Sequence, residues 1–362
     1  MVWNWELPNW PHFSYHSDLI LSKERQFLLN VGAAVASLKN ISTEEYDQFV
    51  VEILSSEGLE SSRIEGEILD RESMQSSIRR HFGLPSISKP EQNKESGMSK
   101  LLFSVYESFD KPLTHDMLFE WHTYLFEHAS RDMSFGRYRT HEEPMQIISR
   151  RYDSPTVFFE APPSNKMDGE MSTFVDWFNN SHSGSILARA AIVHVYFESI
   201  HPFEDGNGRI GRALVEKVLS QGIEKPVLIA VSKTLEKRKK DYYDALGRCN
   251  HTLEIGHWVE FFSDVIIQAQ QDSLSQLYFL IKKSRILTAL NGQLNFRQEK
   301  ALLRIFAEGP AGFQGGMSAD KYIAITHASR ATATRDLADL VEKGALVKTG
   351  ELRHRRYWLN RG

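Results

Sequence analysis

Apolar side chains recur every three or four residues along most of the chain, a spacing typical of helices that bury one face. Residues 186–200 are apolar on nearly every side, which predicts a helix that is buried all round. We therefore expect a mostly α-helical fold, with helices over residues 19–38, 44–54, 117–128, 166–179, 186–200, 209–221, 235–253 and 258–280.

Two segments break this helical pattern. Residues 143–161 carry β-branched and aromatic side chains on both sides of a polar turn at 150–154, which predicts a short β-hairpin. From Phe296 onward the order is helix, glycine-rich loop, short helix, longer helix ended by Gly344, and two short strands, and this order resembles a winged helix-turn-helix. We expect an N-terminal helical region at 1–95, a central domain at 96–290 and a C-terminal module at 296–362.

Composition limits the classes of protein that fit. A chain of 362 residues, 41% of them hydrophobic, can bury one large core and a smaller one. The net charge of −4 indicates no general attraction to nucleic acid or membranes, and the single Cys249 excludes an internal disulfide. No apolar run reaches the ~18 residues of a membrane span, and the start lacks a secretory-signal pattern. We expect a soluble, cytoplasmic protein with no membrane partner.

The residues from His201 to Arg212 carry the densest set of reactive groups, between two predicted helices. Pro202 ends the first helix and leaves His201 at the loop, where an ordinary histidine pKa of about 6.5 suits a general base. Gly206 and Gly208 let backbone N–H groups at the start of the second helix approach an anion.

Acidic and basic side chains in the same loop suit a nucleotide. Asp205 offers a hard oxygen ligand for Mg²⁺, and Arg209 and Arg212 lie three apart on one helix face, where both can reach a polyphosphate. Each feature by itself is more often a turn, a capped helix end or a solvated face. Their contiguous order favours a site that transfers part of a nucleotide to a hydroxyl group.

The stretch resembles the signature of the Fic family, His-Pro-Phe-x-Asp/Glu-Gly-Asn-Gly-Arg-x-x-Arg, and every fixed position is met. The resemblance implies a Fic-fold helical bundle that transfers AMP from ATP to a Ser, Thr or Tyr hydroxyl of a protein. It makes His201 the base, Asp205 the Mg²⁺ ligand, and Arg209 and Arg212 phosphate contacts. It also implies nucleotide binding by Phe203, Glu204, Gly206, Asn207 and Gly208. Some relatives with an altered loop transfer phosphate or phosphocholine, but the unaltered Gly-Asn-Gly-Arg favours AMP.

A second, shorter motif lies in the N-terminal region. Ser61 and Glu65 are four residues apart, so a helix would place them on one face. They resemble the inhibitory helix of the Fic family, here at about 57–69, and the tryptophan-rich opening resembles a module often fused ahead of Fic domains. The resemblance implies that Glu65 binds Arg212, which the ATP γ-phosphate needs, and so acts as a brake. The alternative is an exposed glutamate in an ordinary helix network.

Two further elements suit the same activity. The hairpin at 143–161 resembles the family's flap, which adds a strand to the target segment; the alternative is a hairpin that only stabilises the fold. Tyr243, Leu246 and Asn250 share a helix face and offer the stacking, packing and hydrogen bonds that an adenine ring needs, although a helix core with a polar edge explains them equally well. We expect His194 to pack in the core and Glu198 to brace the loop.

The C-terminal module has a basic character. Residues 320–362 hold nine Lys or Arg and five Asp or Glu, which is a net charge of +4. These side chains form a candidate DNA footprint, although such modules also serve dimerisation or target docking. The residues concerned are Arg330, Thr332, Thr334 and Arg335 on the candidate recognition helix, and Arg353, His354, Arg355 and Arg356 on the wing.

Three functions are compatible with this sequence. The first is a Mg²⁺-dependent protein adenylyltransferase that uses ATP, is inhibited by Glu65 and modifies a target protein or itself. The second is a DNA-binding regulator whose Fic fold senses a nucleotide, and the third is an enzyme that removes AMP with Glu65 orienting a water. The intact His201 favours an enzyme, because a sensor needs no base. The target, the acceptor residue type and a homodimer are left open.

Overall fold

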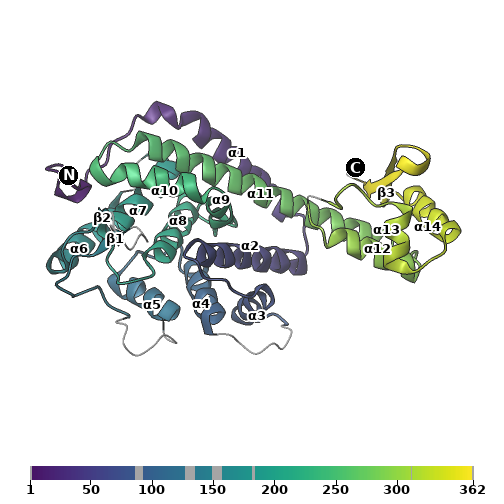
Figure 1. Ribbon diagram of the computed structural model, residues 1–362, viewed down its shortest axis with the longest axis horizontal. Coiled ribbons are helices and arrows are strands. Elements are labelled where there is room, and N and C mark those ends of the chain that lie inside the picture. Colours follow the sequence, from purple (N-terminus) through teal and green to yellow (C-terminus); the bar gives the residue numbers. More distant parts are fainter. Residues whose placement is uncertain are drawn as a thin grey trace. The chain divides into compact units, whose positions relative to one another are not determined.

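The computed structural model describes residues 2–85, 93–126, 135–148, 157–181, 184–310 and 312–360. These residues are mostly α-helical, as predicted, and only small two-stranded sheets accompany the helices (Figure 1). They form two compact units. The first unit comprises Met1–Ala33 and Val50–Ser273, and the second comprises Ala34–Phe49 and Leu274–Gly362. The domain boundaries drawn from the sequence stay a prediction.

Three helices contribute residues to both units: α1 (Leu21–Leu38), α2 (Thr43–Ile64) and α11 (Gly256–Ala289). The other helices of the first unit are α3 (Arg71–His81), α4 (Asn93–Glu107), α5 (His115–Phe126), α6 (Met167–Asn180), α7 (Ile186–Ile200), α8 (Asn207–Ile223), α9 (Val231–Lys237) and α10 (Lys239–Arg248). Short 3₁₀ turns complete it: η1 (Asn4–Glu6), η2 (Ser17–Leu19), η3 (Ser164–Lys166) and η4 (Cys249–His251).

Helices α7 and α8 lie side by side in the core of the first unit (Figure 1). Ser185 caps α7 by accepting a hydrogen bond from the Ala188 N–H, and Val193, Phe197 and Leu214 are fully buried. The predicted apolar helix at 186–200 is therefore confirmed. It is a rigid, dehydrated support for the loop that follows.

Some sequence expectations need correction. The inhibitory helix predicted at about 57–69 ends at Ile64, because Gly66 adopts a left-handed φ of 87°. Glu65 therefore lies in a turn just beyond the helix that carries Ser61. The single helix expected at 235–253 is divided at Arg238 into α9 and α10 and ends in η4.

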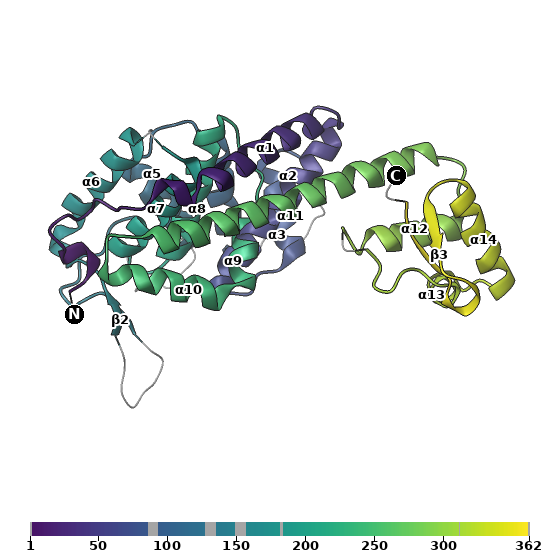
Figure 2. The ribbon, with the colours of Figure 1, turned by 90° about the horizontal axis from the view of Figure 1, so that it is seen from above.

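The predicted hairpin at 143–161 is present in its two strands, β1 (Gln146–Ile148) and β2 (Val157–Glu160). They pair antiparallel, with Ile147 opposite Phe159 and Gln146 opposite Glu160. The turn between them lies outside the described residues. Figure 2 shows this hairpin from above.

The second unit has its own core, formed by Leu302, Ile305, Tyr322, Leu337 and Leu340. Its elements follow the order expected from the sequence, and the winged-helix assignment itself stays a prediction. They are α12 (Phe296–Phe306), α13 (Ala319–Thr326), α14 (Arg330–Glu342), β3 (Leu346–Thr349), η5 (Leu352–His354) and β4 (Arg356–Leu359), with β3 and β4 antiparallel.

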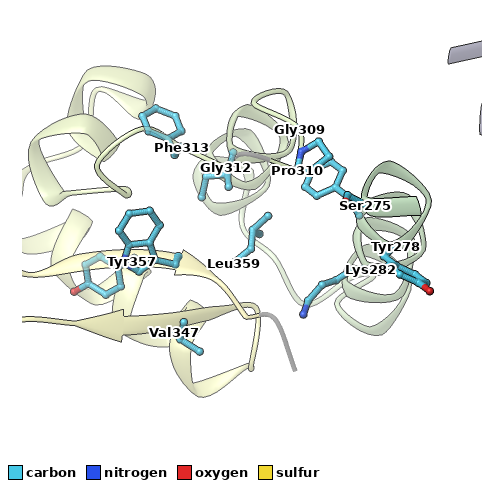
Figure 3. A pocket seen from close by; sticks show the side chains of 13 residues that line it. Ser275, Tyr278, Lys282, Gly309, Pro310, Gly312, Phe313, Val347, Tyr357 and Leu359 are labelled. Atoms are coloured by element: carbon cyan, nitrogen blue, oxygen red, sulfur yellow. The ribbon is translucent and has the colours of Figure 1, made fainter. Parts of the chain in front are cut away.

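A pocket of about 720 Å³ lies within the second unit (Figure 3). Aromatic side chains line it from three elements: Tyr278 of α11, Phe313 of the loop before α13, and Tyr357 of β4. None of the predicted site residues belongs to this lining. None of the described helices combines the length and the apolar character needed to cross a lipid bilayer.

Candidate functional site

The loop between α7 and α8 is closed by its own side chains. His201 ends α7 in a left-handed conformation with φ 49°, and Pro202 prevents the helix from continuing. Asn207 at the start of α8 accepts a hydrogen bond from the Phe203 N–H at 2.9 Å and donates one to the Phe203 carbonyl at 2.8 Å. The Asn207 amide therefore holds the loop, rather than pointing at a ligand.

Two residues outside the 201–212 stretch support this loop, and His122 is the one that the sequence reasoning missed. Arg139, 2% exposed, donates from Nε to the His201 carbonyl at 2.8 Å and from its backbone to the Pro202 carbonyl at 2.9 Å. His122 stacks on Phe203 with ring centroids 4.2 Å apart. Each contact joins positions far apart in sequence, so local patterns do not indicate these pairings. They keep the loop in one conformation.

The protonation of His201 follows from its partners. Its Nδ1 lies 3.3 Å from the Glu198 carbonyl, which can only accept, so Nδ1 carries the proton. Burial lowers the pKa of His201 to about 4, so the imidazole is neutral. Its Nε2 is then unprotonated and can accept a proton. This is the state that a general base requires.

The first turn of α8 has the backbone geometry that suits an anion. Gly206 has a left-handed φ of 82°, and the N–H groups at the start of α8 have no partner within the helix. The Glu65 carboxylate reaches into this turn: a Cβ on Gly208 would lie 2.2 Å from Glu65 Oε1 and 3.0 Å from Arg212 Nη1. Gly208 is thus required for this close approach.

Arg212 is 3% exposed and is held by the segment around the end of α2. Its Nε donates to Ser61 Oγ at 2.9 Å, and its Nη2 donates to the Ser61 carbonyl at 2.9 Å and to Glu65 Oε1 at 2.8 Å. Its Nη1 finds no hydrogen-bond partner among the residues that the structure describes. Burial alone would raise the pKa of Glu65, but Arg212 holds it below its ordinary value.

Arg209 has a similar partner that the sequence reasoning missed. Its Nη1 donates to Glu67 Oε2 at 2.8 Å, and its guanidinium lies over the Phe126 ring at 5.0 Å. Both arginines of the motif are therefore bound by carboxylates from the segment that follows α2. This segment thereby takes up hydrogen-bond donors of both arginines.

Comparisons with known proteins agree with this geometry. Residues 112–219 match the Fic/DOC family, and residues 3–84 match a domain family of unknown function (DUF4172). Residues 112–219 are therefore the part of the chain that resembles a Fic domain, and we call this part the Fic domain.

Similar curated proteins include the protein adenylyltransferase Fic of Nematostella vectensis, 26% identical over 237 residues, which are 64% of this chain and 49% of the relative. A probable protein adenylyltransferase of Aquifex aeolicus is 28% identical over 144 residues, 34% of this chain and 43% of the relative. The chain spans about half the length of these curated relatives.

Solved structures share the fold. A Fic family protein from Desulfovibrio desulfuricans G20 aligns with a TM-score of 0.56 at 22% identity, over 96% of this chain and 98% of its own. A Fic domain containing signaling protein from Bacteroides thetaiotaomicron aligns with a TM-score of 0.53 at 19% identity, over 70% of this chain and 96% of its own.

The candidate metal ligand of the Fic domain is solvent-facing. The Asp205 side chain is 60% exposed, and its Oδ1 accepts a hydrogen bond from the Gly206 N–H and lies 3.5 Å from Arg209 Nη2. No cluster of three or more His, Cys, Asp or Glu that could hold a metal occurs in the described part of the chain. One exposed carboxylate fits Mg²⁺, which keeps waters and phosphate oxygens as its other ligands. Glu204 is half-buried beside it.

Glu198 lies behind the motif, on the last turn of α7. Its Oε2 is 3.7 Å from His201 Nδ1, and its Oε1 finds no hydrogen-bond partner in the described residues. Burial, and then the charge of Glu65, raise the pKa of Glu198 to about 8, against a lowering effect of Arg212. His194 packs in the core, as expected, and bonds the Tyr242 hydroxyl at 2.8 Å.

The adenine candidates lie on two elements rather than one helix face. Tyr243, 44% exposed, and Leu246 are on α10, whereas Asn250 is in η4. Asn250 Nδ2 donates to the Phe158 carbonyl of β2 at 3.0 Å. The assignment of these residues to an adenine pocket stays a prediction.

Three of the DNA-binding candidates in the second unit are paired locally. Arg330 forms an ion pair with Asp320, and both side chains are more than 70% exposed. Thr334 donates to the Arg330 carbonyl within α14, and Arg356 donates to the Arg355 carbonyl. The side chain of Arg353 lies outside the described residues. DNA binding by this unit stays a prediction.

Proposed function

We propose that this chain is a protein adenylyltransferase that transfers AMP from ATP to a hydroxyl group of a protein, and that Glu65 inhibits it. Two observations carry the proposal. The Glu65 carboxylate reaches the first turn of α8 and accepts a hydrogen bond from Arg212. The neighbouring His201 has an Nε2 that is free to accept a proton. The names of the curated relatives support the same activity.

The chemistry follows from the groups in place. With Glu65 withdrawn, the N–H groups of α8, Arg209 and Arg212 would bind the triphosphate. His201 Nε2 would take the proton of the acceptor hydroxyl as its oxygen attacks the α-phosphorus. The bond from that phosphorus to the bridging oxygen breaks, and pyrophosphate leaves. Asp205 would hold Mg²⁺, which neutralises phosphate charge when bound.

Glu65 inhibits because a carboxylate and a γ-phosphate compete for one guanidinium. While Arg212 donates to Ser61 and Glu65, only its Nη1 remains for another acceptor. A triphosphate would have to bind without that arginine, with its α-phosphate displaced from His201. Removal of Glu65 is therefore expected to increase transfer.

The test follows label from α-labelled ATP with Mg²⁺ into protein. We expect Glu65→Gly to label itself at least about tenfold faster than the wild type, since one charged hydrogen bond is worth about 1.5 kcal/mol or more. Glu65→Gly with His201→Ala should lose about 10²–10⁴-fold of that rate.

The control is Glu60→Gly, which removes a half-buried carboxylate that pairs with Arg63 in the last turns of α2. It should label like the wild type. Equal labelling by Glu65→Gly and Glu60→Gly would contradict the brake. An absence of labelling in every variant would favour a nucleotide sensor, and loss of label from modified protein on adding wild type would favour AMP removal.

A further inference from the structure

The tryptophan-rich opening of the chain packs against the elements that surround the 201–212 loop. Asn4, in η1, is fully buried. Its Nδ2 donates to Ser199 Oγ at 2.8 Å and to the Cys249 carbonyl at 3.1 Å. Ser199 lies two residues before His201, and Cys249 is next to Asn250. The Asn4 side chain therefore connects the end of α7, the helix that leads into His201, with η4.

The neighbouring tryptophans bind β2, the second strand of the hairpin that resembles a flap, which we call the flap strand. Trp5 Nε1 donates to the Glu160 carbonyl at 2.7 Å, and Trp3 packs edge-on against Phe159 with centroids 5.5 Å apart. Trp3 also stacks on His251 of η4 at 4.7 Å. Figures 1 and 2 both place the N-terminal end of the chain beside β2. We call residues 3–5 the N-terminal brace.

The hydrogen bonds of β2 show what the brace does. Ala161 N–H donates to Met145, and Phe159 pairs with Ile147, so Phe158 and Glu160 direct their carbonyls away from β1. Both outward carbonyls have side-chain donors: Asn250 Nδ2 binds that of Phe158, and Trp5 Nε1 binds that of Glu160. The outer edge of β2 is thus held by η1 and η4.

These contacts matter because the hairpin is small. A two-stranded hairpin is at best marginally stable by itself in water, and β1 and β2 contain three and four residues. Most of their side chains are exposed, with Phe159 the buried exception at 3%. The position of β2 relative to His201 must then depend on the anchors at its root.

We propose that the N-terminal brace positions the flap strand relative to His201 for the binding of a protein acceptor. Trp5 and Asn4 are positioning residues, and the first residues of the DUF4172 match thereby gain a role in the transfer reaction. This inference rests on the proposed function for its consequence, whereas the bracing itself can be measured without activity.

The test uses the full chain carrying Glu65→Gly. Trp5→Phe keeps an aromatic ring and removes the N–H that binds Glu160. Trp10→Phe is the matched control, because Trp10 Nε1 donates at 2.9 Å to Glu170 of α6 instead of to the flap. We expect backbone amides of residues 157–161 to exchange about fivefold faster in Trp5→Phe, the effect of one lost hydrogen bond, and to be unchanged in Trp10→Phe. Equal exchange in the two variants would overturn the brace.

The effect of the brace on transfer is measured from the amounts of AMP that end up bound to protein and free in solution. Water can attack the α-phosphorus in place of a protein hydroxyl, with its proton passing to His201 and pyrophosphate leaving, and water needs no flap. Trp5→Phe should lower the ratio of protein-bound to free AMP about fivefold. Its ATP consumption should stay within about twofold of that of the parent, which is the chain carrying Glu65→Gly alone. A fall in ATP consumption at a constant ratio of protein-bound to free AMP would show that Trp5 has a merely structural role. This result would refute the proposal that Trp5 positions the flap strand.

Failure of the proposed function gives a different result. A parent that consumes no ATP and forms neither product contradicts the transferase activity, and the exchange rates of residues 157–161 then still decide whether the brace exists.

Discussion

Each unit of this protein contains a hydrogen-bonded network around one buried charged side chain, Asp336 in the second unit and Arg212 in the first, and the two networks differ in one respect. In the second unit, Asp336 accepts from Arg297 at 2.8 and 3.2 Å, from the Tyr322 hydroxyl at 2.9 Å and from Asn295 at 3.2 Å. Both of its oxygens are satisfied. In the first unit, Arg212 Nη1 and Glu198 Oε1 remain without partners in the described residues.

The difference separates a structural network from a candidate site. A satisfied buried network stabilises one arrangement of the fold, whereas unsatisfied buried donors are costly unless another molecule uses them. Burial would raise the pKa of Asp336, but its hydrogen bonds from Arg297 and Tyr322 hold it below the ordinary value. The network around Asp336 has no capacity left for a ligand. The network around Arg212 does.

The largest effect is expected on the stability of the second unit, when the satisfied network around Asp336 is broken. Asp336→Asn removes the charge that Arg297 and Tyr322 share, and we expect the second unit to lose about 3 kcal/mol of stability. Hydrogen exchange of the buried amides of α14 measures this loss. Self-labelling by the Glu65→Gly protein should not change.

The control for this substitution is Asp320→Asn, in the same unit. Asp320 and Arg330 are exposed, and such pairs contribute less than about 1 kcal/mol. A similar loss from Asp320→Asn and Asp336→Asn would contradict the assignment of the Asp336 network as the structural one.

The two networks also differ in how much of each the sequence could predict. His201, Arg209 and Arg212 belong to one contiguous stretch, so their approximate arrangement follows from a loop and one helix turn. Asp336 and Arg297 are 39 residues apart, and nothing in either local sequence indicates their pairing. The same holds for Glu67, which binds Arg209 across 142 residues.

Most elements with a clearly apolar face were predicted, but α4 was missed although Met98, Leu101, Leu102 and Val105 form one buried apolar face. Helices α7 and α8 are buried and were found within two residues of their ends, whereas the polar α3 (Arg71–His81) gave no periodic signal. The break at Arg238 between α9 and α10 depends on local backbone geometry, with φ −113° and ψ 27°, that composition does not reveal. The role of Asn4 was missed because burial of a polar side chain depends on partners distant in sequence.

A smaller effect is expected from the unsatisfied network as pH changes. The pKa of Glu198 is raised from 4.5 to about 8 in the folded chain. Such a carboxyl stabilises the fold at low pH, and this contribution is lost as pH rises toward 8. Between pH 6 and pH 8, the free energy of unfolding should therefore fall by about 2 kcal/mol less in Glu198→Gln than in the wild type. Guanidinium unfolding at both pH values measures this difference.

Burial also raises the pKa of Glu57 and Glu216, and these carboxyls are present in both proteins, so the difference reports Glu198. Glu107→Gln, at an exposed position of α4, serves as the control and should follow the wild type. Identical pH dependence in Glu198→Gln and the wild type would mean that Glu198 is ionised in the folded protein.

The smallest effect tests how firmly the segment around the end of α2 holds Arg212. Ser61 Oγ accepts one of the three hydrogen bonds that this arginine donates to that segment. We call the state with these three bonds closed and the state without them open. Ser61→Ala should weaken the closed state by about 1 kcal/mol. The open population, and with it self-labelling, would rise about fivefold, less than in Glu65→Gly because Glu65 still binds Arg212. Ser55→Ala is the matched control, because the Ser55 hydroxyl is buried on the same helix and donates to Val51 of its own helix. Faster labelling by Ser55→Ala would show that loosening α2 is sufficient, and that the hydrogen bond to Arg212 is not what keeps the site closed.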